Sequence, residues 1–203
     1  MKVKKTLLAS MALVALCLVA PTAASAIEKT WFDHDRNSTY SPPPPGKEVT
    51  PHANLTVTAG LVTYGPCQLA LKGFVWNKEG GMGEGSLKLK EPHAACTTST
   101  GGCTITSTTF KKDIGLTLMT NTNVRFSPIE FEWHLSGLCG GGTTKTVTGT
   151  VDGYFIAPTT NGATEWQSSS TVGFTSTPGL TVAGAAATLD GTIEFGTKFT
   201  VIP

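Results

Sequence analysis

Apolar and polar residues alternate along most of the chain from residue 53 onward, a pattern typical of β-strands with one buried and one wet face. The clearest case is the segment 129–135, and 146–156 and 189–202 behave in the same way. In the first segment, four apolar side chains share one face and three polar ones share the other: Ile129, Phe131, Trp133 and Leu135 against Glu130, Glu132 and His134. Shorter strands are predicted at 55–63, 67–76, 86–90, 103–108, 114–120, 164–174 and 179–183.

The predicted fold class is all-β, because no long segment repeats apolar residues at helical spacing. About ten short strands separated by turns indicate a single antiparallel β-barrel or β-sandwich. Glycines inside the long strands, such as Gly149 and Gly153, allow a sheet to coil and favour the barrel. One core accounts for this length of chain, so we expect a single domain over 53–203.

The first 26 residues have the order of a secretory signal peptide: lysines, then the apolar run 7–20, then Ala24-Ser25-Ala26 as a cleavage site. The apolar run is shorter than the roughly 18 residues of a membrane span, and no comparable run follows, so we expect no transmembrane segment in the mature chain. Cys17 follows Leu16, where a lipoprotein site requires a small residue, and we expect it to be removed with the signal. The protein is therefore predicted to be bacterial and secreted or extracytoplasmic, in the periplasm or at the cell surface.

Residues 27–52 differ in composition from the rest and contain four consecutive prolines, Pro42 to Pro45. Proline cannot donate to a β-ladder and favours an extended polyproline II spacer. We therefore expect a Pro-rich extended arm in front of the domain. Its apolar residues Trp31 and Phe32 are candidates to dock on the sheet.

Charge argues against nucleic acid as a partner. The signal removes three of the 15 basic residues and none of the 14 acidic ones, which leaves 12 basic residues and a net charge of about −2. Phosphate binding needs clustered Lys and Arg, and the sequence does not concentrate them.

Four cysteines follow the signal: Cys67, Cys96, Cys103 and Cys139. An even number in an oxidising compartment indicates two disulfides, and zinc is disfavoured because no C-x-x-C pair occurs. Three pairings are possible. The one we favour joins Cys96 to Cys103 across a hairpin tip and Cys67 to Cys139.

The chain also resembles a group of uncharacterised secreted bacterial all-β proteins with four cysteines. The resemblance covers the chain from Cys67 to the C-terminus and rests on the cysteine layout and on three segments rich in Gly, Thr and Val: Gly102 to Thr106, Thr146 to Gly153 and Gly179 to Gly184. It implies export and a β fold, and it implies no activity.

Glu130, Glu132 and His134 form the best candidate metal site, because alternate residues of a strand project together. An ordinary solvated strand face explains the same pattern, and we favour it because the sequence places no second His or Cys nearby. As a glycosidase pair, Glu130 and Glu132 are weaker still, since no cleft is indicated. The segment Asp33-x-Asp35-x-Asn37 begins like a calcium loop, but Ser38 stands where such a loop requires glycine. We therefore expect no cofactor and no catalytic residue.

Exposed tryptophans remain as candidates for ligand binding, because their faces stack on sugars and other flat ligands. Trp76 lies beside a glycine-rich loop, and Trp166 lies between two polar residues. The favoured function is a non-enzymatic exported protein with a structural or binding role. The alternatives are a carbohydrate or small-ligand binding module that uses Trp76 or Trp166, with a cell-envelope ligand, and a metal-dependent enzyme.

Overall fold

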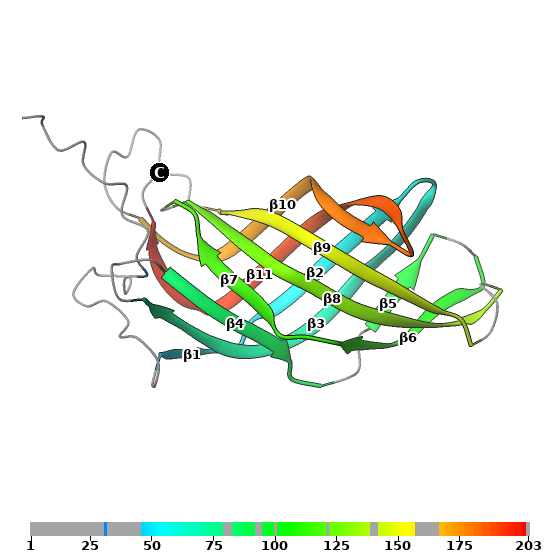
Figure 1. The fold of residues 1–203 in the computed structure, drawn as a ribbon, viewed down its shortest axis with the longest axis horizontal. Helices are drawn as coiled ribbons and strands as arrows, with labels where there is room; N and C mark the ends of the chain where they lie inside the picture. Colours follow the sequence, from blue (N-terminus) through cyan, green and yellow to red (C-terminus); the bar gives the residue numbers. More distant parts are fainter. Residues whose placement is uncertain are drawn as a thin grey trace, which may run out of the picture.

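A computed structural model describes residues 31, 46–78, 83–91, 95–99, 101–120, 122–138, 142–156 and 167–201. Within these ranges the chain forms eleven β-strands and no helix (Figure 1), so the predicted all-β class is confirmed. The strands are β1 (Lys47–Val49), β2 (His52–Ala59), β3 (Val62–Asn77), β4 (Gly83–Leu89), β5 (Ala95–Thr98), β6 (Cys103–Phe110), β7 (Ile114–Leu118), β8 (Asn123–Gly137), β9 (Thr144–Phe155), β10 (Gln167–Val182) and β11 (Ala185–Val201).

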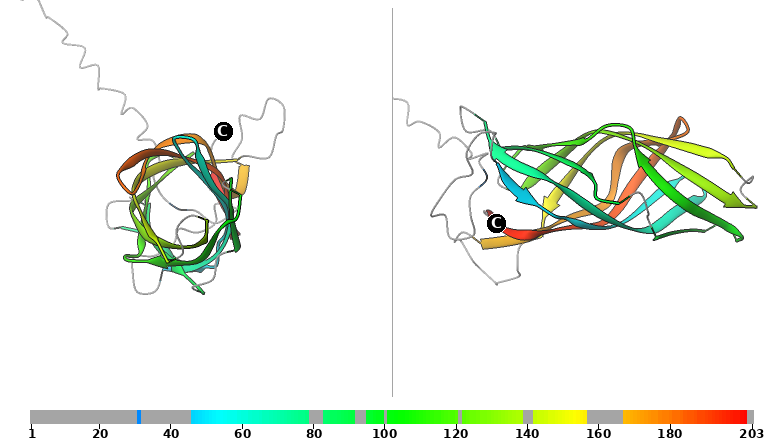
Figure 2. Two further views of the ribbon diagram at one scale, coloured as in Figure 1. Left: turned by 90° about the vertical axis from the view of Figure 1, so that its right-hand side faces the viewer. Right: turned by 90° about the horizontal axis from the view of Figure 1, so that it is seen from below.

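All strands belong to one antiparallel sheet that closes on itself. Eight of them form a ring in the order β2-β11-β10-β9-β8-β6-β5-β3, which the pairing of β2 with β3 completes. Between β3 and β8 the sheet divides, because β5 and β6 bridge them on one route and β4 and β7 on the other. Figure 2 shows the ring from its end. A sandwich, which needs two separate facing sheets, therefore does not describe this chain.

The interior of the ring is filled with apolar side chains contributed by alternate residues of each strand. On β8 the predicted inward set is confirmed, since Ile129, Trp133 and Leu135 are buried and Phe131 is half-buried. The inward residues predicted on β9 and β11 are also buried: Val147, Val151, Phe155, Leu189, Ile193, Phe195 and Phe199. Thr148 and Thr181 hydrogen-bond across the outer face of β9 and β10 at 2.9 Å. The alternation thus separates a dry interior from a hydroxyl-rich exterior.

Part of the segment predicted as an arm belongs to the sheet. β1 pairs with the end of β3, where Glu48 lies opposite Phe74, and β2 begins at His52. Trp31 is 1% exposed, and Asn77 accepts a 2.6 Å hydrogen bond from its backbone N–H. The four prolines lie outside the described residues.

Cys67 and Cys96 form a disulfide between the neighbouring strands β3 and β5, where they are direct register partners. The favoured pairing of Cys96 with Cys103 and of Cys67 with Cys139 is therefore wrong. It fails because β5 is inserted next to β3, so Cys96 meets Cys67 across the sheet. Cys103 is also disulfide-bonded, and Cys139 lies outside the described residues.

Candidate functional site

The predicted metal-binding face of β8 is occupied by ion pairs. Glu130 and Glu132 point outward as predicted, and each binds a lysine just after the end of β6 at 2.8 Å, Lys112 and Lys111 respectively. The Nδ1 atom of His134 lies 3.3 Å from the hydroxyl of Thr144. Across the described ranges, no group of three or more His, Cys, Asp or Glu side chains converges as metal ligands would. The three residues are thus placed on one face, but two of them are held by lysines.

Of the two tryptophans predicted to bind ligand, the structure describes Trp76. It lies on the outer face of β3, is half-buried, and is the register partner of Glu84 on β4. Trp166 lies outside the described residues. Trp133 belongs to the interior, where its ring stacks on Tyr64 with centroids 5.0 Å apart.

A hollow of about 270 Å³ lies on the outer surface over β3 and β4. Phe74 forms its aromatic side and is 48% exposed, which makes it one of the most exposed aromatic residues of the described chain. We call this hollow the Phe74 groove, and its lining residues are Glu48, Lys72, Gly73, Phe74, Ser86, Lys88 and Asp113. The side chains around Phe74 come from different parts of the chain: Glu48 lies on β1, Lys88 lies on β4, and Asp113 directly precedes β7.

The strand registers place charges of both signs around the exposed ring. Glu48 and Ser86 are the direct register partners of Phe74 on its two sides. Lys72 and Lys88 face each other across β3 and β4, and the hydroxyl of Ser86 lies 3.4 Å from a carboxylate oxygen of Asp113. Two lysines and two carboxylates make the lining neutral overall. The groove therefore offers an apolar face with hydrogen-bond donors and acceptors around it.

The Phe74 groove continues into a second hollow of about 260 Å³, because Lys88 and Asp113 line both. This extension lies between the end of β4 and the end of β6 and reaches Phe110 and Thr108. Thr108 is fully buried, and its hydroxyl has no hydrogen-bond partner among the described residues. Together the two hollows form an elongated surface across three strands.

Two other spaces fit a specific ligand less well. The interior cavity is lined by apolar residues such as Leu69, Phe126 and Trp133, but its volume is only about 50 Å³. A cavity that binds benzene measures about 150 Å³, so the interior is too small for a ligand of that size. A broader concavity over β2, β3 and β11, which includes His52, Gln68 and Glu194, is lined by no Phe, Tyr or Trp side chain.

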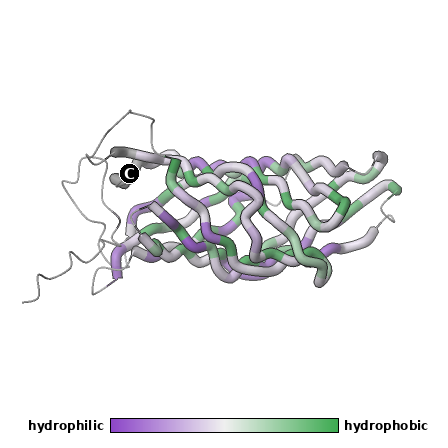
Figure 3. Tube along the Cα trace, turned by 90° about the horizontal axis from the view of Figure 1, so that it is seen from above, coloured by the Kyte–Doolittle hydropathy of each residue, from purple (hydrophilic) through white to green (hydrophobic). Residues whose placement is uncertain are grey.

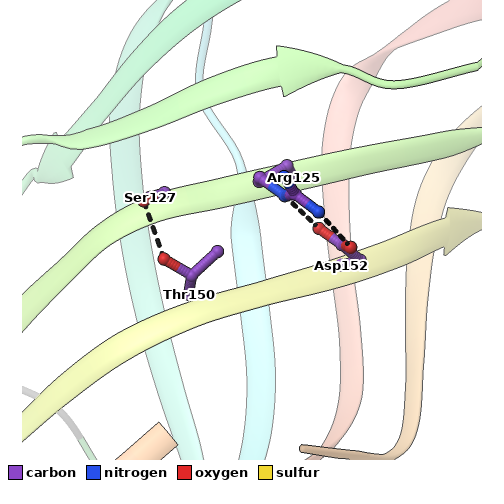
Figure 4. Close-up of polar contacts among 4 residues, drawn as sticks. All are labelled: Arg125, Ser127, Thr150 and Asp152. Carbon is purple, nitrogen blue, oxygen red and sulfur yellow. Dashed lines mark hydrogen bonds and ion pairs between the residues drawn. The ribbon is translucent and has the colours of Figure 1, made fainter. Parts of the chain in front are cut away.

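A separate polar cluster lies on the outer face of β8 and β9, shown in Figure 4. Arg125 donates two hydrogen bonds of 2.8 Å to the two carboxylate oxygens of Asp152. Ser127 and Thr150 hydrogen-bond at 2.8 Å beside them. The hydrogen bonds from Arg125 hold the pKa of Asp152 below its ordinary value. Because each polar group has a partner on the adjacent strand, we assign this cluster to sheet stability.

No protein-family model matches the sequence, and neither a curated protein nor a solved structure matches it. The resemblance to secreted four-cysteine proteins therefore stays a prediction. In the part of the chain that the structure describes, no helix is long and apolar enough to cross a membrane.

Sequence reasoning did not single out Phe74 as a candidate ligand-binding residue. The signal was available in the predicted strand 67–76, where Leu69, Leu71 and Val75 alternate inward and leave Phe74 on the wet face with Trp76. An aromatic side chain on the wet face of a strand is a candidate for stacking on a flat ligand. The contributions of Glu48 and Asp113 could not be found in this way, because they come from other elements.

Proposed function

We propose that the chain is an exported, non-enzymatic protein that binds carbohydrate of the cell envelope through the Phe74 groove. The observation that carries the proposal is the exposed face of Phe74, with lysines and carboxylates at its sides. Sugar rings combine an apolar face, which stacks on an aromatic ring, with a periphery of hydroxyls that need both donors and acceptors.

The neutral lining supports an uncharged ligand. Lys72 and Lys88 are offset by Glu48 and Asp113, so a polyanion gains no net attraction from the groove. The disulfide between Cys67 and Cys96 is compatible with an extracytoplasmic location, because such bonds persist in oxidising compartments. Export itself is inferred from the predicted signal peptide.

Calorimetric titration with uncharged oligosaccharides tests the proposal, with cellohexaose and chitohexaose as probes. Binding to at least one of them is expected, and Phe74→Ala should weaken it about fivefold or more, since stacking is worth on the order of 1 kcal/mol or more. Lys88→Ala should weaken it by a smaller factor, because it removes a single donor at the side of the groove.

Tyr154→Ala is the matched control. Tyr154 is 43% exposed, close to the value for Phe74, but it lies on β9 and outside the groove. Binding should survive this substitution. Equal losses in the two variants, or no binding of either sugar by the wild type, would refute the assignment of the site.

A further inference from the structure

Charged residues are distributed very unevenly along the ring. Its two ends differ: the ends of β2, β5, β8 and β10 and the starts of β3, β6, β9 and β11 lie together at the end of the ring opposite to the end of β11 (Figures 1 and 2). We call this the hairpin end. Over most of their length, the strands that meet there contain a single Asp, Glu, Lys or Arg, Lys145, within the ranges 53–71, 95–110, 135–151 and 171–189. Figure 3 shows the contrast, since the hairpin end is mostly white and green.

Two leucines project from this end, which carries almost no charge. Leu61 lies in the turn between β2 and β3 and is 102% exposed, and Leu138 follows β8 and is 83% exposed. They are the two most exposed large apolar residues of the described chain. Each leucine side chain therefore protrudes from the surface, and we call the two side chains the apolar tips.

Hydrogen bonds place the two tips on one rim. Thr63 lies on β3, two residues after Leu61. Its N–H donates a 2.9 Å hydrogen bond to the hydroxyl of Ser99, and its carbonyl accepts a 2.8 Å hydrogen bond from the N–H of Ser99. The connection that begins at Ser99 ends at Gly102, whose carbonyl accepts a 2.9 Å hydrogen bond from the N–H of Leu138. The β2–β3 turn, the β5–β6 turn and Leu138 thus follow one another around the hairpin end.

We propose that the hairpin end docks on the surface of a lipid bilayer and inserts Leu61 and Leu138 into it. Projecting apolar side chains gain free energy when the headgroup layer covers them. The scarcity of charge matters equally, because charged residues near the tips would lose hydration as the end approached the acyl region. A protein partner would need a concave site for each tip, whereas a fluid bilayer adapts to both. This proposal is independent of the Phe74 groove, whose charged residues lie on other segments.

Flotation of the purified protein with phosphatidylcholine vesicles tests the proposal. The wild type should float with the vesicles, and it should do so equally in 50 mM and 500 mM NaCl, since no charge pairing is involved. Leu61→Ser and Leu138→Ser should each lower the partition coefficient by about tenfold, and the double substitution should abolish flotation. Both residues are exposed, so folding should be unaffected, which circular dichroism of each variant checks.

Ile156→Ser is the matched control, because Ile156 is 42% exposed and follows β9 at the opposite end of the ring. Flotation should be unchanged in this variant. Wild type that stays unbound, or that floats as well after both leucines are replaced, overturns the proposal. Flotation lost in high salt also overturns it, since electrostatic adsorption would then be the cause.

Discussion

Residues of β8 contribute to the buried core or to surface ion pairs, according to the face of the strand on which they lie. Trp133 is 2% exposed and contacts Tyr64 and Phe131, with ring centroids 5.0 and 5.2 Å away. Glu130 and Glu132, on the other face, bind lysines at the surface. Surface ion pairs of this kind contribute little to stability, whereas a buried indole contributes much.

Replacement of Trp133 by Ala should lower the free energy of unfolding by about 3–5 kcal/mol, because it leaves a cavity among aromatic rings. His134→Ala, one position along and outward, should change it by less than about 0.5 kcal/mol. Urea unfolding followed by circular dichroism measures both. Similar values for the two variants would contradict the assignment of the faces.

Asp152 should make a pH-dependent contribution to stability. Its pKa is lowered in the folded state by the hydrogen bonds from Arg125, so the contribution is present above the unfolded pKa of about 3.9 and is lost as the pH falls through the folded value. Asp152→Asn should destabilise the protein at pH 7 by less than about 1 kcal/mol, since the pair is exposed. The difference from wild type should shrink as the pH is lowered from 4 towards 2.

Unfolding at a series of pH values measures this difference. Added salt at pH 7 should reduce it, because salt screens exposed charges. A difference that persists unchanged at pH 2 would show that the substitution disturbs the sheet in some other way.

At the scale of the elements, the alternation of apolar and polar residues predicted most strands. Each strand buries one face, so the pattern can be read from the residues of that strand alone. The turn at Gly60 and Leu61 was missed, and strand 55–63 was predicted across it, because an apolar residue occupies the exposed tip. β5 was missed because its four residues show no clear alternation. The described part of the predicted strand 164–174 and the predicted strand 179–183 belong to one strand, β10, in which the register shifts between Phe174 and Thr177; residues 164–166 lie outside the described residues.

The candidate site was predictable only in part for a related reason. Alternation can place Phe74 and Trp76 on an outer face, but it does not say which strands become neighbours. The meeting of Glu48, Phe74 and Asp113 depends on the pairing of β1 with β3 and of β4 with β7. The disulfide pairing was wrong for the same reason, since it depends on β5 lying beside β3.

Close approach of β9 and β10 should make Gly149 sensitive to substitution. Its φ is 150°, and a Cβ atom there would collide with the carbonyl oxygen of Gly179. Gly149→Ala should therefore destabilise the protein by about 3 kcal/mol or more, since backbone strain and a steric clash add. Gly60 has a φ of 60° with open space around it, so Gly60→Ala should cost only about 1–2 kcal/mol.

Thermal unfolding of the two alanine variants separates the clash from the strain. A melting temperature for Gly149→Ala equal to that for Gly60→Ala would mean that β9 and β10 move apart at little cost.

On the scale of the whole molecule, covalent and hydrogen-bonded links work together to hold the ring closed. The Cys67–Cys96 bond fixes β5 against β3 on one of the two routes that lead to β8. The other route, through β4 and β7, contains no cysteine. The two routes therefore differ in their sensitivity to reduction.

Peptide mapping without reduction should recover Cys67 linked to Cys96. It should also recover Cys103 linked to Cys139, because Cys103 is disulfide-bonded and lies opposite Gly137, two residues before Cys139. Removing the first bond by Cys67→Ala with Cys96→Ala should cost about 3–4 kcal/mol for a sequence separation of 29 residues. A Cys96–Cys103 peptide would contradict the structure.

The pairing of β2 with β11 joins a strand that is synthesised early to one that is synthesised late. β2 is among the first strands to leave the ribosome. The segment that pairs with it, Ala187 to Glu194, belongs to β11, the last strand of the ring to be made. Until that segment is available, β2 and β10 each present an open edge that can pair with another chain. The ring therefore cannot close before the segment Ala187 to Glu194 has been made. A nascent chain that stalls before residue 185 would keep both edges open and would be prone to aggregation.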